Sequence, residues 1–289
     1  MSEEYQAFRK SAGAVELPRD FVRAAGPDVT SFLQGQLSQN VAGLGAGDST
    51  WALLLQPQGK VTAFLRVLRV GEEEFVLETD AGFGPAVIER LNRFKLRVKC
   101  DLEPLAWRCL AVRGPSAHEL VADGVVADWP GLPGRDLVGE SPQAPAGVTM
   151  CGMDAYEAVR IEVGIPVMGS ELDEGTIPAE AGVVDMSVSF TKGCYTGQEL
   201  VARIDSRGGN VPRRLRGLVL EAGPAPVGAT VEVDGKDVGR LTSVAFSPGL
   251  DATVALAYVR RAVEPPAEVI VAWEGGSSPA RVEALPLVP

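Results

Sequence analysis

Lys192-Gly193-Cys194-Tyr195-Thr196-Gly197-Gln198-Glu199 is the most informative segment of this chain. It places one thiol between a glycine and an aromatic residue, two positions after a lysine. A cysteine reacts, or binds a metal, as the thiolate, and positive charge nearby lowers the pKa of the thiol. Gly193 and Gly197 lack side chains and let another molecule approach closely. The alternative is a turn before a helix over Gln198–Ser206, with a cysteine that packs into the core.

Composition excludes one large class of function. The chain has 289 residues, enough for one large or two to three modest domains, and 46% of them are hydrophobic. The formal net charge of -11 argues against a nucleic-acid-binding surface, which needs clustered positive charge. The run Arg213-Arg214-Leu215-Arg216 is either a local basic pocket for an anionic ligand or the start of a solvated strand.

Metal, membrane and disulfide signals are lacking in the sequence. Residues 1–10 are polar, and no run of 18 apolar residues follows, so we expect neither a signal peptide nor a membrane span. The chain has no Cys-x-x-Cys pair that would indicate a zinc site. Four cysteines in a chain of this length do not suggest a disulfide scaffold, so a cytoplasmic location is expected. The single histidine, His118, rules out zinc sites built on several histidines and is expected on a surface helix. The cysteines are Cys100, Cys109, Cys151 and Cys194.

Periodicity predicts a mixed first part. Helices are expected over residues 31–40, from Asp80 as cap to about 96, over 116–122, and from Asp154 as cap to about 163. Strands are expected over 51–55, 61–70, 75–79, 105–112 and 125–129. Residues 130–147 and 165–181 are predicted to be irregular on their Gly and Pro content. Because the strands and helices do not alternate regularly, the class is α+β.

The pattern changes after Pro212. Strands are expected over 215–220, 230–233, 238–246, 253–259 and 268–273, with Asp234-Gly235 as a hairpin turn. Helical periodicity is nearly absent here. We therefore expect a first domain over residues 1–211, with a subdomain break near 101, and a C-terminal β-barrel domain over 212–289.

The octapeptide resembles, residue for residue, the signature of the YgfZ family of folate-binding proteins, which are implicated in iron–sulfur cluster assembly and repair. Other segments resemble the wider glycine-cleavage T-protein (aminomethyltransferase) superfamily. They are Phe32-Leu33-Gln34-Gly35-Gln36-Leu37-Ser38-Gln39-Asn40-Val41, Leu55-Gln56-Pro57-Gln58-Gly59-Lys60-Val61, Arg160-Ile161-Glu162-Val163-Gly164-Ile165-Pro166 and Ile177-Pro178-Ala179-Glu180-Ala181-Gly182. The resemblance implies a folate-binding α+β domain of interleaved ferredoxin-like subdomains, followed by a small β-barrel.

The resemblance also implies a cofactor, partners and a site. Tetrahydrofolate or another reduced folate would bind, iron–sulfur proteins would be clients, and no nucleic acid or membrane is expected. Glu162 would accept hydrogen bonds from the pterin, because a carboxylate can accept two at once. Cys194, at the mouth of the folate cleft, and Lys192 would be the catalytic pair. The remaining folate-binding candidates are Arg160, Gln198, Glu199 and Arg203.

One departure separates the competing hypotheses. The aminomethyltransferases of the superfamily carry an aspartate after the first hairpin turn, whereas the strand here reads Val61-Thr62-Ala63-Phe64-Leu65-Arg66 and has no acid. An iron–sulfur accessory factor that binds folate and uses Cys194 is therefore the first hypothesis. The alternatives are a folate-dependent one-carbon transferase of the aminomethyltransferase type and a folate-binding adaptor without chemistry.

Overall fold

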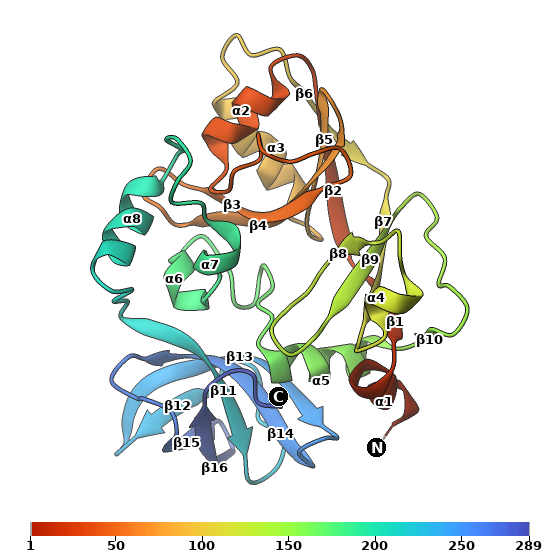
Figure 1. The fold of residues 1–289 in the computed structure, drawn as a ribbon. Helices are drawn as coiled ribbons and strands as arrows, with labels where there is room; N and C mark the ends of the chain where they lie inside the picture. The colour runs from red at the N-terminus through yellow and green to blue at the C-terminus, as the bar shows by residue number, and fades with distance from the viewer. Residues whose placement is uncertain (1, 289) are drawn as a thin grey trace.

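The computed structural model describes residues 2–288 as three parts that meet at the centre of the molecule (Figure 1). The first is an antiparallel five-stranded sheet with strand order β3-β4-β5-β2-β6. Two helices pack on one of its faces and bury a cluster of Val, Leu, Ala and Phe side chains. The elements are β2 (Arg19–Ala25), α2 (Val29–Gln36), β3 (Ser49–Leu55), β4 (Val61–Gly71), β5 (Glu74–Asp80), α3 (Gly84–Arg93) and β6 (Asp101–Leu105).

The second part is another five-stranded sheet, with strand order β10-β1-β7-β9-β8. Its neighbours are antiparallel except for β1 and β10. Helices α1 and α5 pack beside it, and α5 also lies on the third part. The elements are α1 (Glu3–Lys10), β1 (Gly13–Leu17), β7 (Arg108–Arg113), α4 (Ala117–Leu120), β8 (Val125–Val126), β9 (Gly134–Gly139), β10 (Thr149–Met150) and α5 (Met153–Val163).

Three short helices lead into the third part, a closed barrel with strand order β11-β14-β13-β12-β15-β16. Closure leaves no free sheet edge. The helices are α6 (Pro178–Ala181), α7 (Val184–Ser187) and α8 (Gln198–Ser206). The strands are β11 (Arg213–Leu220), β12 (Thr230–Val233), β13 (Lys236–Ser247), β14 (Ala252–Arg260), β15 (Ala267–Trp273) and β16 (Gly276–Glu283). The barrel begins at Arg213, and the domain boundary at residues 211/212 stays a prediction.

The predicted α+β class and the C-terminal barrel are confirmed, and α8 has the predicted bounds. Two predicted segments were wrong in kind. The strand expected over 105–112 is split between β6 and β7, which belong to different sheets, and Trp107 packs on Phe21 at the crossing. The loop expected over 130–147 contains β9, a strand inside the second sheet. Local periodicity reports an extended backbone, but it does not report the sheet to which that backbone belongs.

Two predicted helix caps were also wrong. Helix α3 begins at Gly84 after Phe83, and Asp80 instead ends β5, where its carboxylate pairs with Arg19 and accepts from the Met168 amide at 2.9 Å. Helix α5 begins after Gly152, so Asp154 lies in its first turn. The predictions missed α1, β1, β2 and β16 altogether. No helix among residues 2–288 is both long and apolar enough to cross a membrane.

Candidate functional site

Lys192 fastens the Cys194 segment to the end of α2. Its ammonium donates hydrogen bonds to the backbone carbonyls of Leu37 at 2.6 Å and Gln39 at 3.2 Å, and to that of Gln34. Carbonyls at a helix C-terminus have no partner within the helix, so a lysine there supplies the missing donor. Burial lowers the pKa of Lys192 to about 8. The contacts of this side chain are thus structural, and its catalytic role stays a prediction.

Two glycines fix the other side of the segment. Gly197 precedes α8 with a φ of 85°, and a Cβ added to it would lie 2.5 Å from the carbonyl oxygen of Gln56. A Cβ on Gly59, in the turn between β3 and β4, would lie 2.6 Å from the Cβ of Leu200. The predicted close approach at Gly197 is therefore to the chain's own hairpin turn. Gly193 has no atom within 4 Å of its Cβ position and stays open.

Cys194 is exposed between these two anchors. The next residue, Tyr195, is buried, its ring lies 5.1 Å from the ammonium of Lys192, and its amide donates to Oε1 of Gln198 at 3.1 Å. The thiol is therefore exposed to solvent, and the contacts on both sides of it hold the segment in place. The alternative of a core-facing cysteine before a helix is wrong for this residue.

The other three thiols lie in different environments. Cys100 and Cys109 are buried, and Cys151 is half-buried. Burial raises the pKa of all three thiols, that of Cys151 to about 11 and that of Cys109 well above its usual range. Since the thiolate is the reactive form, the fold disfavours chemistry at these three positions. Cys109 lies on β7 in the core.

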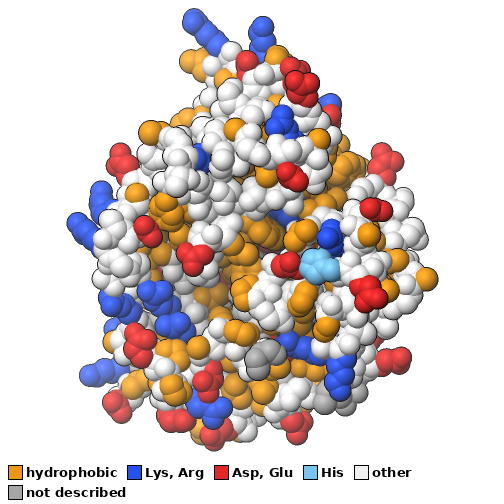
Figure 2. Space-filling view, viewed as in Figure 1, with side chains coloured by type: hydrophobic (Ala, Val, Ile, Leu, Met, Phe, Trp, Pro, Cys, Tyr) orange, Lys and Arg blue, Asp and Glu red, His pale blue; other side chains and the backbone are white. Residues whose placement is uncertain are grey.

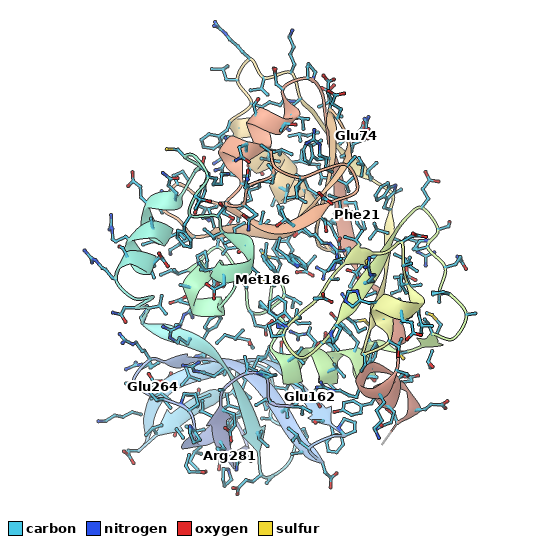
Figure 3. The ribbon with its side chains drawn as sticks, in the orientation of Figure 1. Phe21, Glu74, Glu162, Met186, Glu264 and Arg281 are labelled. Carbon is cyan, nitrogen blue, oxygen red and sulfur yellow. The ribbon has the colours of Figure 1, made fainter. Side chains whose placement is uncertain are left out.

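Glu162 and Arg160, the predicted pterin-site pair, both face the barrel from α5. The carboxylate of Glu162 is fully buried and accepts from the hydroxyls of Tyr5 at 3.0 Å and Ser247, and it pairs with Arg9. Because these partners enclose its carboxylate, Glu162 is closed to solvent in this structure, and its role as a pterin ligand stays a prediction. Figure 3 shows it at the junction of α5 and the barrel.

Arg160 has a full set of protein partners as well. Its guanidinium pairs with Glu157 at 2.7 Å and with the buried Glu171 at 3.3 Å, and it donates to Ser243 of β13 at 2.8 Å. Sequence reasoning missed the residues on α1 and β13 that enclose this pair, because nothing within α5 indicates that a distant strand supplies the hydroxyls.

The remaining predicted ligands lie on α8. Glu199 and Arg203 are exposed, and Gln198 caps the turn at Tyr195. Figure 1 shows α8 and α5 on different sides of α6 and α7. The five predicted folate ligands are therefore divided between two helices, and their common role in binding folate stays a prediction.

The surface is hollowed where the three parts meet. Figure 2 shows apolar side chains on the floor of this hollow, and Figure 3 places Met186 of α7 beside it. The underlying core cluster draws on β3, β4, α5, the short helices and the barrel, and Trp51, Trp129 and Met186 are half-buried against it. Within that cluster the ring centroids of Trp51 and Phe64 lie 4.7 Å apart in a stacked arrangement. A concave apolar surface of this kind is typical of small-molecule sites.

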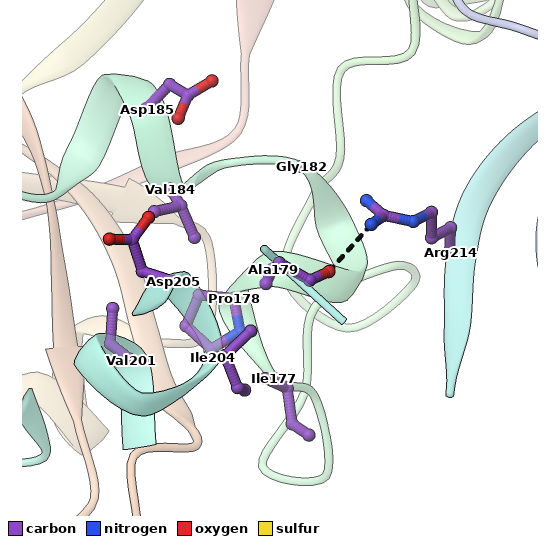
Figure 4. A pocket seen from close by; sticks show the side chains of 11 residues that line it. Ile177, Pro178, Ala179, Gly182, Val184, Asp185, Val201, Ile204, Asp205 and Arg214 are labelled. Atoms are coloured by element: carbon purple, nitrogen blue, oxygen red, sulfur yellow. Dashed lines mark hydrogen bonds between the residues drawn. The ribbon is translucent and has the colours of Figure 1, made fainter. Parts of the chain in front are cut away.

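A pocket lies between α8 on one side and α6 and α7 on the other (Figure 4). It is lined by Pro178 of α6, Val184 and Asp185 of α7, Ile204 of α8 and Arg214 of β11. The guanidinium of Arg214 donates to the carbonyl of Gly209 at 2.8 Å. The pocket has a volume of about 170 Å³, below that of ordinary small-molecule sites, which is about 300–1,000 Å³. A complete folate therefore does not fit there.

A buried ionic cluster joins the two sheets. Possible metal-ligating atoms of Glu78, Cys109 and Asp136 lie within 4.8 Å of one another. Both carboxylates are already paired with arginine: Arg66 contacts Glu78 and, at 2.7 Å, Asp136, while Arg113 contacts Asp136 at 2.5 Å. Burial also keeps the Cys109 thiol protonated. We therefore assign this cluster to structural ion pairing.

Comparisons with known proteins agree with this architecture. Residues 1–130 match the GCVT N-terminal domain, and residues 213–289 match the glycine cleavage T-protein C-terminal barrel domain. The glycine cleavage system aminomethyltransferase T from Bartonella henselae superposes with a TM-score of 0.84 at 23% identity, over 99% of this chain and 89% of that one. This chain has the T-protein fold.

Relatives found by sequence carry two kinds of description. The aminomethyltransferase of Streptomyces avermitilis is 28% identical over 98% of this chain and 88% of its own length, and that of Thermus thermophilus is 29% identical over 99% and 90%. An uncharacterized protein of Haemophilus influenzae is 26% identical over 79% of this chain and 82% of its own length.

Proposed function

We propose that this T-protein-fold chain is a tetrahydrofolate-binding accessory protein for iron–sulfur cluster assembly or repair, with Cys194 as its working thiol. The observation that carries the proposal is the presentation of Cys194: an exposed thiol held between Lys192 and Gly197, each fastened to another element. A single thiolate cannot hold a cluster, which takes about four ligands. The client or a small thiol must therefore supply the others.

The apolar hollow supports the folate part of the proposal. Reduced folate would lie in this hollow, where the three parts meet above the core cluster that contains the stacked Trp51 and Phe64. The superfamily that the sequence resembles binds folate, and relatives named aminomethyltransferase match nearly the whole chain, which favours the same ligand here. When bound, the folate would supply a one-carbon carrier, whereas the protein side chains would position its ring and keep water from it.

Aminomethyl transfer is the second candidate, favoured by the names of the relatives. Against it, the strand after the first hairpin has Phe64, buried and stacked on Trp51, in a stretch without any carboxylate. Incubation with an aminomethylated lipoyl carrier protein and tetrahydrofolate should therefore yield no methylenetetrahydrofolate. Sustained turnover would make the transferase the better assignment.

Calorimetry and complementation test the first candidate together. Tetrahydrofolate should bind the purified chain, and Cys194→Ser should bind it equally well, because the exposed thiol contributes nothing to packing. In cells that lack the protein, Cys194→Ser should fail to restore iron–sulfur enzyme activity, whereas the matched control Cys151→Ser should restore it. Full rescue by Cys194→Ser would reject the thiol mechanism, and absence of folate binding would reject the ligand.

A further inference from the structure

A second cavity lies on the side of the β3–β4 turn that faces α3. Its volume of about 480 Å³ is within the range of small-molecule sites, about 300–1,000 Å³. The turn between β3 and β4 forms one wall, and α3 forms another. Among its lining residues are Gln56, Gln58, Thr62, Arg90, Phe94 and Glu174.

Arg90, which lines this cavity, is a buried cation without a counter-ion. It is 6% exposed, and among residues 2–288 no carboxylate lies within 4.0 Å of its guanidinium nitrogens. Its hydrogen bonds go to the carbonyl of Leu55 at 2.8 Å and, weakly, to Oε1 of Gln36 at 3.4 Å, and its Nε has no partner. A buried charge that lacks its partner is strongly destabilising.

Two neighbours, Phe94 and Arg93, affect the guanidinium of Arg90. The ring of Phe94 lies 4.0 Å from its Cζ and covers one face of the guanidinium, so the edge with its N–H groups is the part left for a ligand. Burial, followed by repulsion from Arg93, lowers the pKa of Arg90. An anion bound beside Arg90 would raise its pKa again, because an opposite charge stabilises the protonated form.

Thr62 is the second unsatisfied group in the same cavity. Its side chain is 8% exposed, and its Oγ1 is buried without a hydrogen-bond partner. Buried polar groups nearly always have a partner, so each exception calls for an explanation. The Nε of Arg90 and the Oγ1 of Thr62 both lack a hydrogen-bond partner within residues 2–288, and both residues line this cavity. A bound oxyanion would supply an acceptor for both groups.

We propose that this cavity binds a small carboxylate ligand, whose oxygens accept hydrogen bonds from Arg90 and Thr62. The planar fork of arginine matches a carboxylate. The other charges set the class of ligand. Glu89 and Arg93 pair with each other at 3.1 Å, and Glu174, exposed on the cavity wall, has no ion pair within residues 2–288. A doubly charged phosphate would be repelled by Glu174, whereas an amino acid could offer its ammonium to it.

This site goes beyond the proposed function, because neither Cys194 nor the apolar hollow contributes a side chain to it. The two proposals fail separately. The carboxylate site can be absent while Cys194 supports iron–sulfur enzymes, and the reverse can hold.

Titration calorimetry of the full chain with acetate, glycine and inorganic phosphate tests the site. We expect saturable binding of acetate and glycine that is tighter than that of phosphate, at least about tenfold weaker in Arg90→Gln and about fivefold weaker in Thr62→Val. The matched control Arg93→Gln, whose parent side chain is 67% exposed, should change the affinity by less than about twofold.

Three outcomes would overturn the proposal. They are no saturable binding of either carboxylate, phosphate binding as tight as acetate binding, and equal affinity losses in Arg90→Gln and Arg93→Gln. If Arg90→Gln does not fold, Arg90→Lys serves instead, since it keeps the charge and removes the planar fork. Unchanged affinity in that variant and in Thr62→Val would equally reject the site.

Discussion

Lys192 shows how one residue of a functional motif can act through structure. Its ammonium donates hydrogen bonds to backbone carbonyls at the end of α2, and these bonds hold the segment that carries Cys194. The sequence predicted that this lysine acts on the thiol through its charge. Its acceptor Leu37 is 155 residues away along the chain, a pairing that no local pattern indicates.

Lys192→Met should lower the free energy of unfolding by about 1–3 kcal/mol, because the carbonyls lose their donor. Its effect should also depend on pH. The pKa is about 8 in the folded chain and about 10.4 when unfolded, so between these values the unfolded state binds more protons and stability rises with pH. Urea unfolding of both proteins at pH about 7 and about 9.5 measures this difference.

The control for this experiment is Lys60→Met, which removes an exposed lysine from the β3–β4 turn. Its unfolding free energy should follow that of the parent chain at both pH values. A Lys192→Met variant whose deficit does not grow between the two pH values would show that the ammonium is not desolvated in the folded chain.

At the scale of elements, the β3–β4 turn and the N-terminus of α8 form one packed unit. Gly59 and Gly197 meet so closely that neither has room for a methyl group. The same turn forms a wall of the cavity that contains Arg90. The hairpin therefore lies between the thiol segment on one side and the proposed carboxylate site on the other.

Gly197→Ala should destabilise the chain by at least about 2 kcal/mol, because the methyl group would meet Gln56 and Leu55 and the residue has a positive φ. Gly193→Ala, four positions earlier in the same motif, should stay within about 0.5 kcal/mol, since its Cβ would meet no atom within 4 Å. Thermal unfolding of both variants distinguishes them. Equal losses would mean that the glycines are not packed as described.

Sequence patterns predicted elements with strong local signals and failed where distant chain segments decide. Helix α8 was predicted with its observed bounds, because Gly197 and the apolar positions after it lie within one segment. The split between β6 and β7 was not, because both are extended and only their sheet partners differ. For the candidate site, the exposed Cys194 agreed with prediction. The enclosure of Glu162 was not predicted, because its partners Tyr5 and Ser247 come from opposite ends of the chain.

At the scale of the whole molecule, α5 connects the parts. Glu162 joins it to α1 and to the barrel, Arg160 joins it to Glu171 and β13, and Tyr156 packs under the second sheet. These links are buried, so the barrel and the two sheets are coupled through side chains of a single helix.

Glu162→Ala should lower the free energy of unfolding by about 3–5 kcal/mol, because Arg9 and two hydroxyls would be left buried without their acceptor. Glu157→Gln, on the same helix but 36% exposed, should cost less than about 1 kcal/mol. Chemical denaturation compares the two. A Glu162→Ala chain as stable as the parent would contradict the contacts assigned to this residue, and would return it to the role of a pterin ligand.

The alkylation rate of each cysteine in the folded chain tests most directly whether the molecule presents one thiol for chemistry. Mass spectrometry after timed exposure to an alkylating reagent resolves Cys100, Cys109, Cys151 and Cys194 separately. We expect Cys194 to react first, and Cys109, buried between the two sheets, to react only when the chain unfolds. If Cys194 reacts as slowly as Cys109, its thiol is not presented for chemistry, and the proposed function loses the observation on which it rests.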